Sequence, residues 1–169
     1  MSNQDFEQSQ KSEDKDAAAI RIFPPGIPLA TVLIGLAFQY IWPASLDLSL
    51  PTPLRYWVGG AIITGAIYFL GFRAVLIMRR SGQSENPYKT TTEIIESGPY
   101  RLTRNPMYLQ MVLVCIGLAV VLSNPWIFIL TPVCVLLLHF LVILPEEAYL
   151  ERKFGAPYLE YKKRVRRWI

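Results

Sequence analysis

The chain has 169 residues, a length typical of one domain, and 52% of them are hydrophobic. The apolar residues are concentrated in long runs, which excludes an ordinary soluble domain and favours an integral membrane protein. The net charge of +4 does not indicate a nucleic-acid partner, because most of the excess basic residues lie beside the apolar runs, where they contact anionic lipid headgroups and set the topology.

Residues 1–21 form a polar segment rich in Gln, Ser, Asp, Glu and Lys. Such a segment cannot bury enough apolar surface to order itself, so we predict a disordered N-terminal tail. Residues 22–169 are then expected to form a single membrane domain.

Four apolar segments follow in the chain, and we expect each to be a transmembrane helix. They are Ile27–Trp42, Leu54–Met78, Pro106–Leu122 and Trp126–Leu144. Glycines recur on the second segment, where they let helices approach closely in lipid. The third and fourth segments are separated by a short Asn124-Pro125 turn, so they form an antiparallel hairpin.

An amphipathic tail follows the fourth segment, which we expect Pro145 to end. Its large apolar residues recur at spacings of three and four, which places them on one helical face. They are Leu150, Phe154, Tyr158, Tyr161, Val165 and Trp168. The run Gly155-Ala156-Pro157 is expected to divide the tail into two short helices lying on the membrane surface. The predicted fold class is therefore an all-α integral membrane protein with about four transmembrane helices plus an amphipathic C-terminal helical segment.

The basic residues predict the topology. Five Lys or Arg residues lie in the 79–105 loop and seven in the tail, whereas the loops at 43–53 and 123–125 contain none. The only basic residue near that opposite side is Arg55. By the positive-inside rule, both termini and the large loop are cytoplasmic.

The cysteine and histidine content predicts no metal site. Cys115 and Cys134 both lie in apolar runs, where reduced, buried cysteine is the expected state. There is no CxxC motif and no Cys/His cluster, and the single histidine, His139, is expected to bond to a neighbouring helix.

The least generic stretch is the polar loop from Ser97 to Tyr108, between two apolar runs. Gly98-Pro99 is a turn signal. Asn105 is the predicted N-cap of the next helix, with Pro106 as its first residue. A polar loop that enters the membrane at a helix N-terminus suits an anionic ligand group.

The topology brings a set of polar residues to one membrane face. They are Tyr100, Arg101, Arg104, Asn105, Tyr108, Glu146 and Glu147. Carboxylates hold an ammonium group, an arginine or a helix N-terminus holds a carboxylate, and tyrosine rings face a sulfonium. This set of residues suits S-adenosylmethionine. The alternative is a structural membrane protein in which these polar residues bond only to one another.

Two longer motifs carry a family resemblance. They are T-T-E-I-I-E-S-G-P-Y-R-L-T-R-N-P-M-Y at Thr91–Tyr108 and E-E-A-Y-L-E-R-K-F-G-A-P-Y-L-E-Y-K-K-R-V-R-R-W at Glu146–Trp168. In these motifs the chain resembles the isoprenylcysteine carboxyl methyltransferase family and the related phospholipid methyltransferases. The resemblance implies a membrane methyltransferase that uses S-adenosyl-L-methionine, with the cofactor site in residues 91–169.

The resemblance also implies residue roles. Those lining the cofactor would be Thr92, Glu93, Ile94, Ile95 and Tyr100. The main cradle at the helix start would be Asn105, Pro106, Met107 and Tyr108. Glu146, with Glu147, would close the site. Arg104 and Glu147 are the candidate catalytic residues: Arg104 would hold the loop or a substrate anion, and Glu147 would take a proton from an amine acceptor. Two alternatives need no ligand: Arg104 as a headgroup anchor, and the two glutamates as caps of the tail helix.

At two positions the chain differs from the eukaryotic prenylcysteine enzymes, and both differences bear on the methyl acceptor. Asn105 stands where the eukaryotic prenylcysteine enzymes have histidine, and Val142 lies near the place of an arginine that meets their substrate's carboxylate. We expect a lipophilic acceptor. The resemblance predicts an enzyme like the isoprenylcysteine carboxyl O-methyltransferases, and the alternative is N-methylation of the ethanolamine headgroup of a phospholipid. The expected partners are this acceptor and membrane lipids, with no nucleic acid and no metal. The alternative from another class is a non-catalytic lipid-binding protein of the same fold.

Overall fold

The computed structural model describes residues 22–47, 50–82 and 91–169, which contain helices and no strand. The elements are α2 (Gly26–Ile41), α3 (Thr52–Gly65), η1 (Ala66–Phe72), α4 (Arg73–Arg80), η2 (Gly98–Arg101), α5 (Pro106–Val121), α6 (Pro125–Leu138), η3 (His139–Ile143), α7 (Leu144–Phe154) and α8 (Ala156–Arg164). The predicted all-α class is confirmed for this part of the chain. The predicted disordered tail lies outside the described residues.

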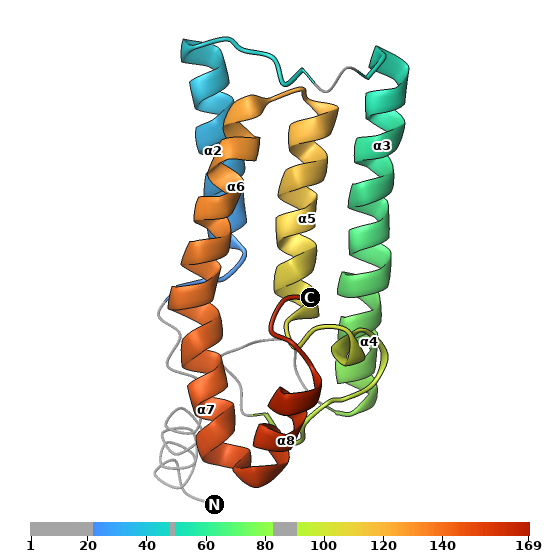
Figure 1. Ribbon diagram of the computed structural model, residues 1–169, viewed down its shortest axis with the longest axis vertical. Helices are drawn as coiled ribbons and strands as arrows, with labels where there is room; N and C mark the ends of the chain where they lie inside the picture. The colour runs from blue at the N-terminus through green and yellow to red at the C-terminus, as the bar shows by residue number, and fades with distance from the viewer. Residues whose placement is uncertain (1–21, 48–49, 83–90) are drawn as a thin grey trace, which may run out of the picture.

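Two helices run continuously through several of these elements (Figure 1). One spans Thr52–Arg80 (29 residues) and the other Pro125–Phe154 (30 residues), and both are long and apolar enough to cross a bilayer. Only 11% and 33% of the residues in their most apolar stretches are buried inside the protein. They are therefore unlike the buried core helices of soluble proteins, and their exposed apolar faces call for a lipid environment.

The prediction that Pro145 ends the fourth apolar segment is wrong. The helix continues through this proline to Phe154. A proline inside a helix removes one backbone hydrogen bond and crowds the carbonyl group four residues earlier. Here the π turn η3 directly precedes α7, and such a wider turn is a common way to absorb a disruption of the helical ladder. Glu146 and Glu147 consequently lie on a rigid extension of the membrane helix.

The other two predicted segments form shorter helices. α2 and α5 have 16 residues each, and their bounds lie within about one residue of the predicted ones. Both run alongside the long helices, with α5 between the long helix that contains α3 and the one that contains α6 (Figure 1). That all four helices cross the membrane stays a prediction.

Close packing between α3 and α5 depends on glycine. A Cβ atom on Gly59 would lie 2.8 Å from the carbonyl oxygen of Gly117, and one on Gly117 would lie 3.0 Å from the carbonyl oxygen of Gly59. The close approach expected from the glycines of the second segment is therefore confirmed at Gly59. It does not extend to Gly60 and Gly65, around which a Cβ atom would meet open space.

The tail reverses direction at Gly155, whose φ of 58° lies in the left-handed region. The predicted break at Gly155 is confirmed, because α7 ends at Phe154 and α8 begins at Ala156. Only α8 is a separate short helix, since α7 is the end of the long helix Pro125–Phe154. The predicted helical face reaches only to α8, since the chain becomes extended at Val165. Residues 165–169 then run to the foot of α5, where Trp168 packs against the hydrophobic core (Figure 1).

Candidate active site

The polar loop from Ser97 to Asn105, which leads into α5, is held by several defined contacts. It contains the 3-10 turn η2, where Gly98 has a φ of 59° and where a Cβ atom would collide with the side chain of Ile77. Farther along the loop, the buried Thr103 hydroxyl accepts a hydrogen bond from the backbone N–H of Asn105 (3.1 Å) and donates one to the carbonyl oxygen of Arg167 (2.9 Å). The loop thus holds the start of α5 in a defined position.

Asn105 occupies the N-cap position of α5, but its side chain does not cap the helix as predicted. Its Nδ2 instead donates a hydrogen bond to the carbonyl oxygen of Arg167 (3.0 Å). The physical reason is competition: residues 165–169 offer the buried amide a backbone acceptor. The Asn105 side chain therefore makes no capping bond to the first-turn N–H groups of α5, which begins with Pro106. These groups stay available to a ligand at the helix N-terminus.

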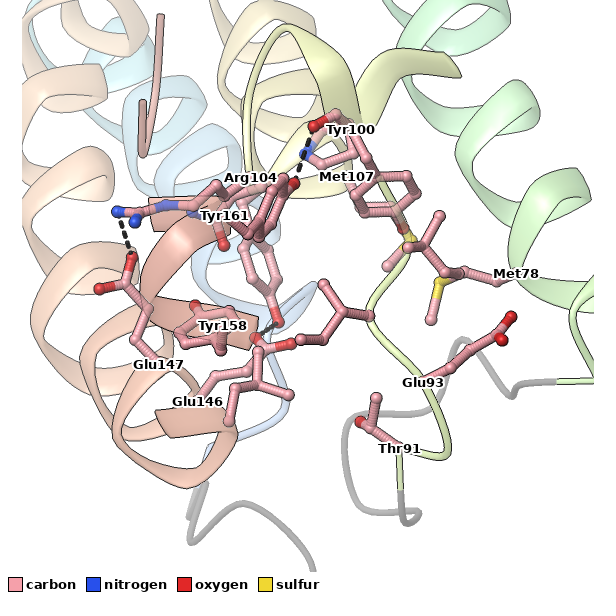
Figure 2. Close-up of a pocket in the computed structure, with 16 residues that line it drawn as sticks. Met78, Thr91, Glu93, Tyr100, Arg104, Met107, Glu146, Glu147, Tyr158 and Tyr161 are labelled. Atoms are coloured by element: carbon pink, nitrogen blue, oxygen red, sulfur yellow. Dashed lines mark hydrogen bonds and ion pairs between the residues drawn. The ribbon is translucent and has the colours of Figure 1, made fainter. Parts of the chain in front are cut away.

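A cavity of about 700 Å³, including the part open to solvent, lies at this helix start (Figure 2). The lining residues are Met78, Thr91, Glu93, Ile94, Ile95, Tyr100, Arg104, Asn105, Pro106, Met107, Tyr108, Glu146, Glu147, Leu150, Tyr158 and Tyr161. Eleven of the twelve predicted site residues are among them. Thr92 is not: it is exposed, and Thr91 lines the cavity in its place. That these residues bind a cofactor stays a prediction.

Glu146 comes to the cavity from α7 and meets α5. Its Oε2 accepts a hydrogen bond from the hydroxyl group of Tyr108 at 2.8 Å. The side chain is partly buried, and the bond fixes its direction toward the cavity. An ionised carboxylate has about four acceptor positions, so Glu146 keeps capacity for a cationic ligand group.

Glu147 has different surroundings, although it is the next residue. Its Oε1 accepts hydrogen bonds from Arg104 Nη2 (3.0 Å) and Arg167 Nε (2.8 Å), and its Oε2 accepts one from Arg167 Nη2 (2.8 Å). Lys162 Nζ lies 3.8 Å from Glu147 Oε2. The Glu147 hydrogen bond raises the pKa of the Arg167 guanidinium. The buried Glu147 carboxylate therefore joins Arg104 to Arg167.

Three tyrosines complete the cavity wall. Burial raises the pKa of the hydroxyl groups of Tyr100, Tyr158 and Tyr161, so all three stay protonated at physiological pH. Tyr161 donates its hydrogen bond to the carbonyl oxygen of Tyr100 (2.7 Å). The hydroxyl group of Tyr100 is buried and has no hydrogen-bond partner among residues 22–47, 50–82 and 91–169. An unpartnered polar atom in a cavity wall is what a missing ligand would leave.

Several lining residues fall outside the sequence-based prediction. Tyr158 and Tyr161 are buried, as expected for packing residues, and they line the cavity as well. Their spacing of three residues, which places both on one face of a helix, is the sequence feature that could have indicated a shared position in the cavity wall. Arg167 was missed because nothing distinguishes it in sequence from the other basic tail residues. Two arginines lie elsewhere: Arg73 and Arg101 are exposed and do not line the cavity.

Comparison with known proteins supports the family resemblance. The family model described as "Phospholipid methyltransferase" matches residues 54–157, which is more than half of the chain. A relative in Haemophilus influenzae, described as an uncharacterized protein, is 36% identical over 63 residues, covering 37% of this chain and 100% of that protein. No solved structure matches. With this match and with apolar helices able to cross a bilayer, the chain belongs to the phospholipid methyltransferase family, a family of membrane methyltransferases.

Proposed function

We propose that the protein is a membrane-embedded methyltransferase that uses S-adenosyl-L-methionine to methylate a lipophilic acceptor. The observation that carries the proposal is the cavity at the start of α5. It combines uncapped helix N–H groups, a carboxylate with free acceptor capacity in Glu146, and an unpartnered buried hydroxyl group in Tyr100. These groups complement a ligand that has both a carboxylate and an ammonium group.

The residues of the cavity fit the cofactor by charge. The N-terminus of α5, around Pro106 and Met107, would hold the carboxylate of the cofactor, and Glu146 would hold its ammonium group. The faces of Tyr100 and Tyr158 would lie against the positively charged sulfonium region. The bound cofactor supplies an already activated methyl group. The protein's own contribution is then to align the acceptor and to exclude water.

The candidate catalytic residues Arg104 and Glu147 are better suited to shaping the site. Three hydrogen bonds from guanidinium groups stabilise the ionised form of Glu147, which makes it a poor proton acceptor. Glu146, by contrast, accepts one hydrogen bond from the hydroxyl group of Tyr108 and contacts no guanidinium group among the bonds described. We therefore assign Arg104 and Glu147 to the support of the loop and leave ligand contact to Glu146.

The acceptor is either a carboxylate, as in prenylcysteine methylation, or an amine, as in the ethanolamine headgroup of a phospholipid. Val142 favours the second. This side chain is fully buried within the hydrophobic core and does not line the cavity. The carboxylate-binding arginine of the prenylcysteine enzymes thus has no counterpart at that position. The description of the matching family model agrees with an amine acceptor.

We further propose that α2 and α5 also cross the membrane, giving four crossings. Sixteen residues span about 24 Å, somewhat less than the 30 Å of a typical hydrocarbon core. The positively charged end, with the cavity, would face the cytoplasm. Thiol labelling in sealed vesicles tests this topology: cysteines introduced at Ser45 and at Arg152 should react from opposite sides, whereas labelling of both from the same side contradicts it.

Calorimetric titration of the detergent-solubilised protein with S-adenosylmethionine and S-adenosylhomocysteine tests the function. Binding in the micromolar range is expected, and Glu146→Gln should weaken it about tenfold or more, because a hydrogen bond to a charged group is lost. Arg152→Ala, which removes an exposed arginine of α7, is the matched control and should bind normally.

The result also decides between the alternatives. Absence of binding by folded protein would contradict the methyltransferase proposal and favour a non-catalytic lipid-binding protein. If the cofactor binds, methyl transfer to phosphatidylethanolamine and to a prenylated cysteine in the same detergent compares the two acceptors. Transfer to the prenylcysteine alone would overturn the preference for an amine.

A further inference from the structure

We infer that residues 165–169, here called the strap, hold the cofactor loop in its binding geometry, and that Arg167 is the positioning residue that couples the strap to the loop through Glu147. This inference rests on the proposed cofactor site. It concerns a part of the chain that lies beyond the residues 54–157 matched by the family model.

The strap contacts the loop through its backbone. The N–H of Arg104 donates a hydrogen bond to the carbonyl oxygen of Arg166 (3.0 Å). The carbonyl oxygen of Arg167 accepts two more, from the hydroxyl group of Thr103 (2.9 Å) and from Nδ2 of Asn105 (3.0 Å). Three consecutive loop residues are thus bonded to two consecutive strap residues. Because one of them is Asn105, the strap is also the reason that α5 lacks its side-chain cap.

The Arg167 side chain closes a second link between strap and loop. Its guanidinium contacts both oxygens of Glu147 at 2.8 Å, and Glu147 Oε1 also accepts from Arg104 Nη2 at 3.0 Å. The Arg104 side chain is 8% exposed and that of Glu147 is 6% exposed, so this pair is shielded from water, whereas the Arg167 side chain is 30% exposed. Paired, forked hydrogen bonds of this kind fix direction as well as distance. Glu147 therefore fixes Arg104 with respect to Arg167.

Packing anchors the strap to the membrane helices. Trp168 packs against the hydrophobic cluster that includes Val142, Ile143 and Tyr108. His139 Nε2 lies 3.5 Å from Arg167 Nη1, on the side facing η3. The strap is consequently held between α5 and the long helix that carries both glutamates. A displacement of the strap would move the loop and the start of α5 together.

The test compares the full chain with variants by calorimetric titration of S-adenosylhomocysteine. Arg167→Ala should weaken binding at least about tenfold, because small displacements of positioning groups are costly. Arg167→Lys should recover only part of the affinity, since lysine keeps the charge but cannot contact both carboxylate oxygens in a fork. In the Glu147→Gln background, Arg167→Ala should have little further effect, because both substitutions break the same link. Arg152→Ala is the matched control.

Amide hydrogen exchange of residues 98–108 provides a readout that needs no ligand. Exchange in the loop should accelerate in Arg167→Ala and not in Arg152→Ala, at a temperature well below the melting temperatures of both variants. If Arg167→Ala does not fold, Arg167→Lys decides the question. Unchanged loop exchange together with unchanged affinity in a folded Arg167 variant overturns the inference. An unmodified chain that binds no cofactor overturns the proposed function, while faster loop exchange would still support the mechanical link.

Discussion

Two helices of the bundle begin with the same dipeptide, Asn-Pro, and the two starts differ. At the start of α6, Asn124 Oδ1 accepts hydrogen bonds from the N–H groups of Trp126 (2.9 Å) and Ile127 (3.0 Å). Its Nδ2 donates to the carbonyl oxygen of Gly35 (3.2 Å). At the start of α5, Asn105 leaves the first turn uncapped and bonds to Arg167.

The difference shows that a hydrogen-bond partner from a distant part of the chain can override the local N-cap preference of asparagine. The N-cap preference of asparagine is worth about 1 kcal/mol, and a backbone acceptor supplied from another part of the chain is enough to redirect the side chain. The capped start lies in a turn between two apolar helices. The uncapped start faces the cavity for which we propose a ligand. Local rules are most often broken at functional sites.

The largest expected effect is at the capped start. Asn124→Ala removes two capping bonds and leaves the buried carbonyl group of Gly35 without its partner, so the free energy of unfolding should fall by about 2 kcal/mol. Unfolding in detergent, followed by circular dichroism, measures this. The folded fraction should bind S-adenosylhomocysteine normally. A loss below about 0.5 kcal/mol would show that the two starts are energetically alike.

Asn105→Ala should affect cofactor affinity more than stability, which is the reverse of the effect expected for Asn124→Ala. Cofactor affinity should fall about tenfold, or about 1.4 kcal/mol, because the loop loses one of its bonds to the strap. Stability should change by less than about 1 kcal/mol, since the carbonyl group of Arg167 still accepts from Thr103. Calorimetry and the same unfolding measurement give both numbers. A variant that loses stability but keeps full affinity contradicts a ligand-binding role for this helix start.

Tyr100→Phe tests whether a ligand supplies the hydrogen-bond partner of the Tyr100 hydroxyl group in the cavity at the start of α5. The buried hydroxyl group has no partner in the described part of the chain, so its removal should leave stability unchanged or raise it by about 1 kcal/mol. Affinity for S-adenosylhomocysteine should fall about threefold if the ligand supplies that partner. Thermal unfolding with and without ligand separates these effects. Lower stability without ligand would indicate a structural bond for this hydroxyl group.

The smallest effect is expected at Thr92, the predicted site residue that lies outside the cavity lining. Because its side chain is exposed, Thr92→Ala should change stability and affinity by less than about 0.5 kcal/mol. The neighbouring Thr91→Ala, within the lining, is the comparison variant and should weaken binding more. Equal effects of the two substitutions would argue against the cavity as the ligand site.

The sequence predicts much of this arrangement because many of its signals are local. Pro106 starts α5 and Gly155 separates α7 from α8, as their conformational preferences require. The motifs around Tyr100 and Glu146 indicate residues that do line one cavity. Sequence patterns do not reveal contacts between residues that are far apart in the chain. The π turn before Pro145, the diverted side chain of Asn105 and the contact of Arg167 with Glu147 all depend on partners that no local pattern reveals.

The bond between Thr103 and Arg167 has a consequence for biosynthesis. Its two residues are 64 positions apart in the chain, and every apolar helix of the bundle is synthesised before the second one. A chain translated as far as Gly155 already contains every apolar helix described above. It lacks the groups that order the loop in front of α5. A variant that ends at Gly155 should therefore keep these helices and yet fail to retain the cofactor that we propose for the site, because its loop lacks the hydrogen bonds to residues 166 and 167.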